Sequence, residues 1–120
     1  MPGRPIGIDE GPPEVPKPGQ RDVQPVKLTS LGTRVEGFHV IVIARWTSGV
    51  EPCTVLDSVV LKKAAGSIEV TVREGTSDPG AVCNMLAKLK WIGVDVGELN
   101  GVWTISDTEG GAKPIEFGGP

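Results

Sequence analysis

Hydrophobic and polar residues alternate along much of the chain from Val26 onward. The clearest run, Phe38–Trp46, is rich in β-branched residues. Successive side chains of a strand point to opposite faces, so this run places Phe38, Val40, Val42, Ala44 and Trp46 on one face and Ile41 and Ile43 on the other. The pattern predicts a central β-strand with Trp46 in the core.

Two further runs predict a β-hairpin. Leu56–Lys62 places Val59 and Leu61 on one face, and Ile68, Val70 and Val72 alternate with Glu69, Thr71 and Arg73. The intervening Ala64-Ala65-Gly66-Ser67 fits a tight turn, because Gly supplies the positive φ that such turns require.

Shorter runs complete the pattern. We expect strands at Val26–Leu31, Leu86–Val96, Val102–Ile105 and Pro114–Phe117. Ala81–Leu89 competes as a helix, but its flanking Gly and Pro residues allow one short turn at most. About seven strands at a spacing of roughly 8–12 residues predict an all-β fold, a single antiparallel β-sandwich.

Proline and glycine concentrate near the N-terminus. Seven of the 11 prolines lie in the first 25 residues, with four glycines between them. Each Pro removes a backbone donor, so we expect a disordered Pro/Gly-rich linker over residues 1–25 and the β-sandwich domain over residues 26–120. A ligand for aromatic grooves is the alternative, but Pro13, Pro16 and Pro18 lack a convincing recognition context, and the spacer interpretation is favoured.

Composition narrows the class of protein. A chain of 120 residues with 38% hydrophobic and 22% charged residues fits one globular domain. The longest apolar run, Val40–Ala44, is far shorter than a transmembrane segment. The net charge of −3, the absence of a Lys/Arg block and the 4% aromatic content argue against a nucleic-acid partner.

The two cysteines, Cys53 and Cys83, both lie beside loop residues. They fit one disulfide that joins two loops at the same end of a sandwich, or else two buried free thiols of a cytosolic protein. His39 is the only histidine. We therefore expect neither a zinc site, nor another cofactor, nor Cys/His nucleophilic catalysis.

The carboxylates do not form a convincing catalytic pair. Asp57, Asp95 and Asp107 fall at expected strand ends or turns, where acidic residues are common for backbone reasons. We therefore expect that the chain is not an enzyme.

One polar loop, two tryptophans and four lysines are the candidate binding residues. The longest polar connection, Glu74–Gly80, is the first choice for a recognition surface, with Glu74, Thr76, Ser77 and Asp78 as candidate contacts. Trp91 and Trp103 are candidate aromatic contacts, with core packing as the alternative. Lys62, Lys63, Lys88 and Lys90 are expected to face solvent, where they would block edge-to-edge aggregation or meet an acidic partner.

A wider resemblance involves four segments. Pro52–Asp57, the hairpin through Ser67–Val72 and Ala81–Cys83, followed by Gly101–Ile105, are similar to an uncharacterised β-sandwich module of bacterial secreted proteins and lipoproteins. The resemblance covers about Val26 to Phe117. It implies an immunoglobulin-like sandwich, an oxidised Cys53–Cys83 pair and an envelope or extracellular location, and it carries no active-site residues.

Met1-Pro2-Gly3 lacks the apolar region of a signal peptide. We expect either that an export segment is absent from this chain or that the protein is cytosolic, and we favour the former. The expected function is a non-catalytic extracytoplasmic module, monomeric or weakly dimeric, that binds an unknown protein or glycan partner or serves as a spacer. A small secreted inhibitor or a carrier of an apolar ligand is the alternative.

Overall fold

A computed structural model describes residues 11–118, which form eight β-strands and no helix. Consequently, no helix of this part of the chain is long and apolar enough to cross a membrane. The strands are β1 (Arg21–Val26), β2 (Ser30–Glu36), β3 (His39–Ser48), β4 (Val55–Ala64), β5 (Ser67–Thr76), β6 (Lys88–Asp95), β7 (Trp103–Asp107) and β8 (Ile115–Phe117).

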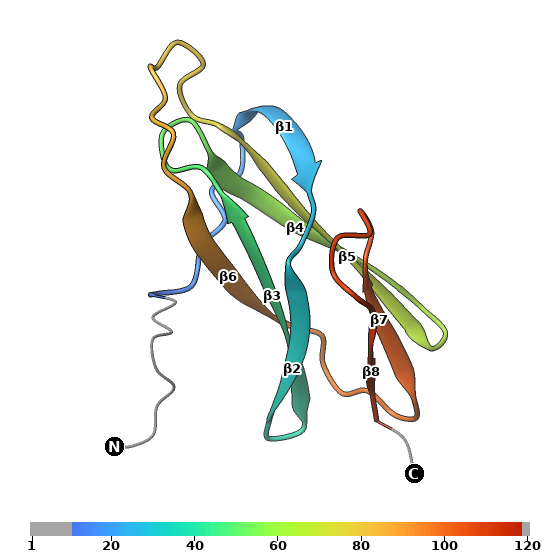
Figure 1. The fold of residues 1–120 in the computed structure, drawn as a ribbon. Helices are drawn as coiled ribbons and strands as arrows, with labels where there is room; N and C mark the ends of the chain where they lie inside the picture. Colours follow the sequence, from blue (N-terminus) through green and yellow to red (C-terminus); the bar gives the residue numbers. More distant parts are fainter. Residues whose placement is uncertain (1–10, 119–120) are drawn as a thin grey trace.

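The strands make two sheets (Figure 1). Sheet B contains β2, β3 and β6 in the order β2-β3-β6, all antiparallel. In sheet A the long strand β5 pairs with β4 along one edge, while its other edge pairs with β1 and, further along, with β7. Strand β8 then pairs with β7. Strand β5 is therefore the centre of sheet A.

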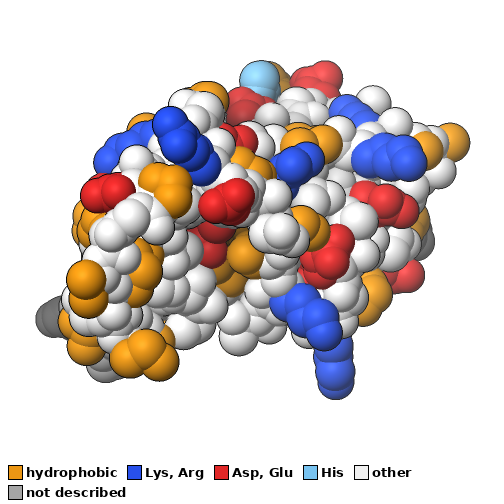
Figure 2. Space-filling model, turned by 90° about the horizontal axis from the view of Figure 1, so that it is seen from above, with side chains coloured by type: hydrophobic (Ala, Val, Ile, Leu, Met, Phe, Trp, Pro, Cys, Tyr) orange, Lys and Arg blue, Asp and Glu red, His pale blue; other side chains and the backbone are white. Residues whose placement is uncertain are grey.

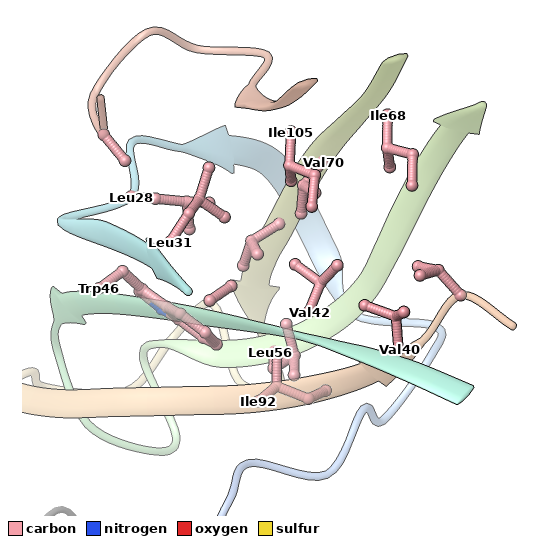
Figure 3. Close-up of a cluster of buried hydrophobic side chains, with 14 residues drawn as sticks. Leu28, Leu31, Val40, Val42, Trp46, Leu56, Ile68, Val70, Ile92 and Ile105 are labelled. Carbon is pink, nitrogen blue, oxygen red and sulfur yellow. The ribbon is translucent and has the colours of Figure 1, made fainter. Parts of the chain in front are cut away.

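The inward faces of the two sheets enclose one hydrophobic core (Figure 3). Strand β3 contributes Val40, Val42, Ala44 and Trp46 from sheet B, as its alternation predicts. Sheet A contributes Leu56, Ile68, Val70, Val72 and Ile105. Burial of these side chains is the main force that holds the sheets together, at about 25 cal/mol per Å² of apolar surface removed from water.

The hairpin prediction is confirmed in detail. Strands β4 and β5 pair from Val55↔Gly75 to Ala64↔Ser67, and Gly66 in the turn has φ of 76°. The sequence pattern did not predict an irregularity in β4, where Leu56 pairs with Glu74 but Ser58 pairs with Arg73. Asp57 is thus an extra residue in β4, a β-bulge, and it changes which residues of the strand face the core.

Several finer predictions need correction. The strand expected at Val26–Leu31 is instead the end of β1, a short connection and the start of β2. Strand β2 has weak alternation and contains Gly32, which conceals its period. The sheets are not wholly antiparallel, because β5 and β7 run parallel. Phe38 lies in the turn before β3 and is 81% exposed, so it does not belong to the core face.

The β-structure also begins earlier than Val26. Strand β1 starts at Arg21 and includes Pro25, which an edge strand tolerates because its missing N–H need not face a partner. The linker prediction for residues 1–10 lies outside the described residues. Residues 11–20, which we call the strap, form no strand but are held by backbone hydrogen bonds to both sheets.

The strap lies along one open side between the sheets. The N–H of Glu14 donates to the carbonyl of Trp91 in β6 (2.8 Å), and the N–H of Lys17 donates to the carbonyl of Leu56 in β4 (2.9 Å). The bulged Asp57 carboxylate accepts from the N–H groups of Gly19 and Gln20 at 2.9 and 3.0 Å. The strap therefore covers parts of the edges of β6 and β4.

Candidate functional site

The disulfide end of the molecule carries the first candidate surface. Cys53 and Cys83 are joined, with their Cα atoms 5.8 Å apart. Cys53 precedes β4, and Cys83 lies in the connection from β5 to β6, residues 77–87, which we call the Cys83 loop. The loop projects beyond the strand ends at the top of Figure 1. The disulfide thus anchors a protruding loop near its middle.

The polar residues predicted to bind a partner make hydrogen bonds that hold this loop in place. Thr76 is the last residue of β5, and its hydroxyl donates to the carbonyl of Pro52 (3.0 Å). The N–H of Ser77 donates to the same carbonyl (3.0 Å). The Asp78 carboxylate accepts from the N–H of Gly80 within its own turn (3.1 Å). These side chains serve the loop's conformation and are largely occupied.

The exposed part of the Cys83 loop is apolar. Val82 is 97% exposed and Met85 is 95% exposed, while Leu86 and, at the start of β6, Leu89 are also exposed. Between Asp78 and Lys88 the chain carries no charged residue. Figure 2 looks down on this end of the molecule, and hydrophobic side chains gather at one edge of the view. Contiguous exposed apolar side chains typically mark an interaction surface.

Glu74 does not belong to a loop, which corrects the sequence-based prediction. It lies in β5 with its side chain buried, and its Oε2 lies 2.8 Å from the Nζ of Lys90. The same oxygen accepts from the Trp46 indole N–H (3.0 Å) and the Ser48 hydroxyl (2.9 Å). The side chains of Lys90 and Glu74 are only 2% and 4% exposed. Lys90 was expected to face solvent, as Lys62, Lys63 and Lys88 do.

A cleft of about 430 Å³ lies between the strap and the outward face of sheet B. We call it the Trp91 cleft. Its floor includes Ile41, Trp91 and Gly93, and residues 13–16 of the strap line it as well. Its polar lining comes from Arg34, Glu36, Asp95 and the strap residue Glu14.

The indole of Trp91 is held in the cleft by the strap, because its N–H donates to the carbonyl of Gly11 (3.0 Å). Trp103, the other candidate aromatic contact, lies in sheet A and packs partly against the core. Its N–H donates to the carbonyl of Asn100, and the Lys63 ammonium lies 5.5 Å from the ring centroid. The two tryptophans therefore do not share one binding platform.

The three aspartates considered as catalytic candidates have structural partners. Donation from the backbone N–H of Gln20, then from the Ser58 side chain, lowers the pKa of Asp57. Donation from the N–H of Gly97, then from His39, lowers the pKa of Asp95. Asp107 is buried, and its carboxylate accepts from the N–H groups of Leu28, Glu109, Gly111 and Ala112.

Within residues 11–118, no three His, Cys, Asp or Glu side chains come together as metal ligands would. Comparisons of the chain with protein-family models, with curated proteins and with solved structures find no match. A sequence signal existed for the loop, the uncharged run from Pro79 to Ala87. For the cleft the sequence singled out Trp91 alone, and it gave no sign that residues 13–16 of the strap complete the wall.

Proposed function

We propose that this chain is a non-catalytic, extracytoplasmic binding module of immunoglobulin-like type that contacts a protein partner through the Cys83 loop. The observation that carries the proposal is the near-complete exposure of Val82 and Met85 on a loop anchored by a disulfide. Disulfides persist mainly in oxidising compartments, which supports a location outside the cytoplasm. An anchored loop loses little conformational entropy when it binds.

A protein partner is favoured over a lipid surface by the composition of the loop. Membrane-binding segments typically carry Trp or Tyr and a cluster of basic residues, which interact with lipid headgroups. Residues 77–87 contain neither an aromatic nor a basic residue. The nearest basic residue, Lys88, is paired with Glu14 at 3.3 Å. An uncharged, apolar recess on a protein is the complementary surface.

The experiment places a photo-crosslinking amino acid at Met85 and, as a matched control, at Val60, which is 46% exposed on β4. Each variant is irradiated with the envelope and culture-fluid fractions of the source cells. We expect a discrete protein adduct from position 85 that is absent from position 60 and is abolished by Leu86→Ser. Identical patterns at both positions, no adduct, or co-sedimentation with anionic phospholipid vesicles would contradict the proposal.

A small inhibitor is the second candidate, and the protrusion of the anchored loop favours it. An inhibitor presents a rigid loop to a target enzyme, whereas a simple binding module leaves the partner's activity unchanged. The adduct from position 85 distinguishes the two. If its partner is an enzyme, that enzyme should lose activity with the wild-type chain and keep activity with Met85→Ser.

A further inference from the structure

We infer that the Trp91 cleft binds a neutral glycan, with the indole of Trp91 against the apolar face of a sugar ring and the polar lining against its hydroxyl groups. This inference does not rest on the Cys83 loop. It concerns the outward face of sheet B and the strap.

The apolar side of the cleft is held in position. Gly93 of β6 pairs with Ile43 of β3 and lies diagonally across from Ile41, and Ile41, Trp91 and Gly93 all line the cleft. A Cβ atom at Gly93 would stand 3.0 Å from Cγ2 of Ile41 and 3.9 Å from Cζ3 of Trp91. Glycine therefore lets Ile41 pack closely over β6 beside the indole, so that Ile41 and Trp91 line one apolar wall, while the Gly11 carbonyl holds the indole N–H. A preorganised aromatic surface loses little entropy on binding.

The charges of the lining are already paired. Arg34 lies 2.7 Å from Glu36, His39 lies 2.8 Å from Asp95, and Lys88 lies 3.3 Å from Glu14. An ionic ligand would have to compete with these partners, so a charged group is not the best occupant. A purely hydrocarbon ligand is also disfavoured, because it would remove water from charged groups without replacing the lost hydrogen bonds.

An extended peptide is disfavoured for a different reason. Peptides that bind sheet edges use the free backbone groups of the edge strand. The strap already occupies the Trp91 carbonyl through the N–H of Glu14. The remaining class is a neutral molecule with one apolar face and several hydroxyl groups, which describes a sugar ring. The volume of about 430 Å³ lies within the usual range of ligand sites and suits a short oligosaccharide segment.

The test is an NMR titration of the full chain labelled with nitrogen-15. The probes are oligosaccharides derived from cellulose, chitin, xylan, mannan and starch, and the signals are the indole N–H resonances of Trp46, Trp91 and Trp103. At least one probe should shift the Trp91 resonance and leave the other two unchanged, with a Kd below about 1 mM. A sulfated glycan, a fatty acid and a proline-rich peptide are titrated in parallel.

Two variants and one control complete the experiment. Trp91→Ala should weaken binding about tenfold or more, because aromatic anchors dominate such contacts. Arg34→Gln, a change at an exposed residue, should also weaken binding and serves if Trp91→Ala does not fold. Lys62→Gln, a change at an exposed residue of β4, should bind as the wild type does.

Three results would overturn the inference. The first is that no neutral oligosaccharide shifts the Trp91 resonance up to about 10 mM. The second is unchanged affinity in both Trp91→Ala and Arg34→Gln. The third is that the sulfated glycan, the fatty acid or the peptide shifts Trp91 while the neutral probes do not. A failure of the crosslinking experiment at Met85 would leave this titration unaffected, so the two proposals fail separately.

Discussion

Replacing Lys90 by methionine removes the positive charge that faces Glu74 in the interior. Methionine fills a similar volume, so the change isolates the charge from the packing. The Glu74 carboxylate would then remain buried, with the neutral Trp46 and Ser48 donors as its partners. Breaking a buried ion pair on one side typically costs about 3–5 kcal/mol. For a domain of this size, that loss corresponds to a fall of about 15–30 °C in Tm.

A second change should restore most of this stability. In the double variant Glu74→Gln/Lys90→Met, no buried charge remains, and the Gln carbonyl can still accept from the Trp46 indole N–H. We expect the double variant to lie within about 1–2 kcal/mol of the wild type, because neutral replacement of a buried pair is often tolerated. The matched control is Lys17→Met, since Lys17 and Glu51 form a 2.9 Å pair whose side chains are 56% and 58% exposed. Its loss should be below about 1 kcal/mol.

Guanidinium unfolding followed by tryptophan fluorescence measures these differences, provided that the slope of the free energy with denaturant is the same for all variants. The reasoning is refuted if Lys90→Met is as stable as Lys17→Met. It is also refuted if the double variant is no more stable than Lys90→Met alone, because then the unpaired charge is not the cause of the loss.

Three further changes give defined outcomes. Replacing both Cys53 and Cys83 by serine should lower the free energy of unfolding by about 3–4 kcal/mol, the chain-entropy value for a closed loop of 30 residues, and should lower Tm by at least about 10 °C. Two free thiols in the wild-type chain, detected by intact mass under non-reducing conditions, would contradict this prediction. The pKa of Asp57 is lower in the folded chain than in the unfolded chain, so its carboxylate stabilises the fold above about pH 4, and this contribution is lost as the pH falls through the folded pKa. In urea unfolding at different pH values, Asp57→Asn should lack this part of the acid dependence. Identical pH profiles for the variant and the wild type would show that the contacts between Asp57 and the strap do not contribute to stability. Asp107→Ala should destabilise the domain by about 3–5 kcal/mol in the same assay, because four backbone N–H groups lose their acceptor; a loss below about 1 kcal/mol would mean that water replaces the carboxylate.

The strand pattern could be predicted where alternation is strong. Strand β3 and the hairpin of β4 and β5 are long, and most of their inward residues are apolar, so local sequence identifies their period and, outside the bulge at Asp57, the face that each side chain occupies. Strand β2 could not be identified in the same way, because Gly32 interrupts its period. Its position is fixed by pairing with β3, a contact that depends on the folded chain.

The candidate site was harder to predict for a related reason. Lys90 and Glu74 each look like surface residues within their own segments, and only their approach across the core explains their burial. The strap was interpreted from its proline content as a spacer, yet the prolines leave the N–H groups of Glu14, Lys17 and Gly19 available for bonds to the sheets. Proline content predicts the absence of regular structure, and it does not predict whether a segment is packed.

The strap precedes β4 and β6 in the sequence, and this order has a consequence for synthesis. Ribosomes make the N-terminal part first, so residues 11–20 have already been made when β4 and β6 are completed. The backbone groups of Leu56 and Trp91 can then meet their partners as soon as these strands form. A cover encoded at the C-terminus would leave both edges open until the last residues emerged, which is when unpaired strands associate with other nascent chains. The order of segments along this chain thus allows the edges of β4 and β6 to be covered as soon as these strands form.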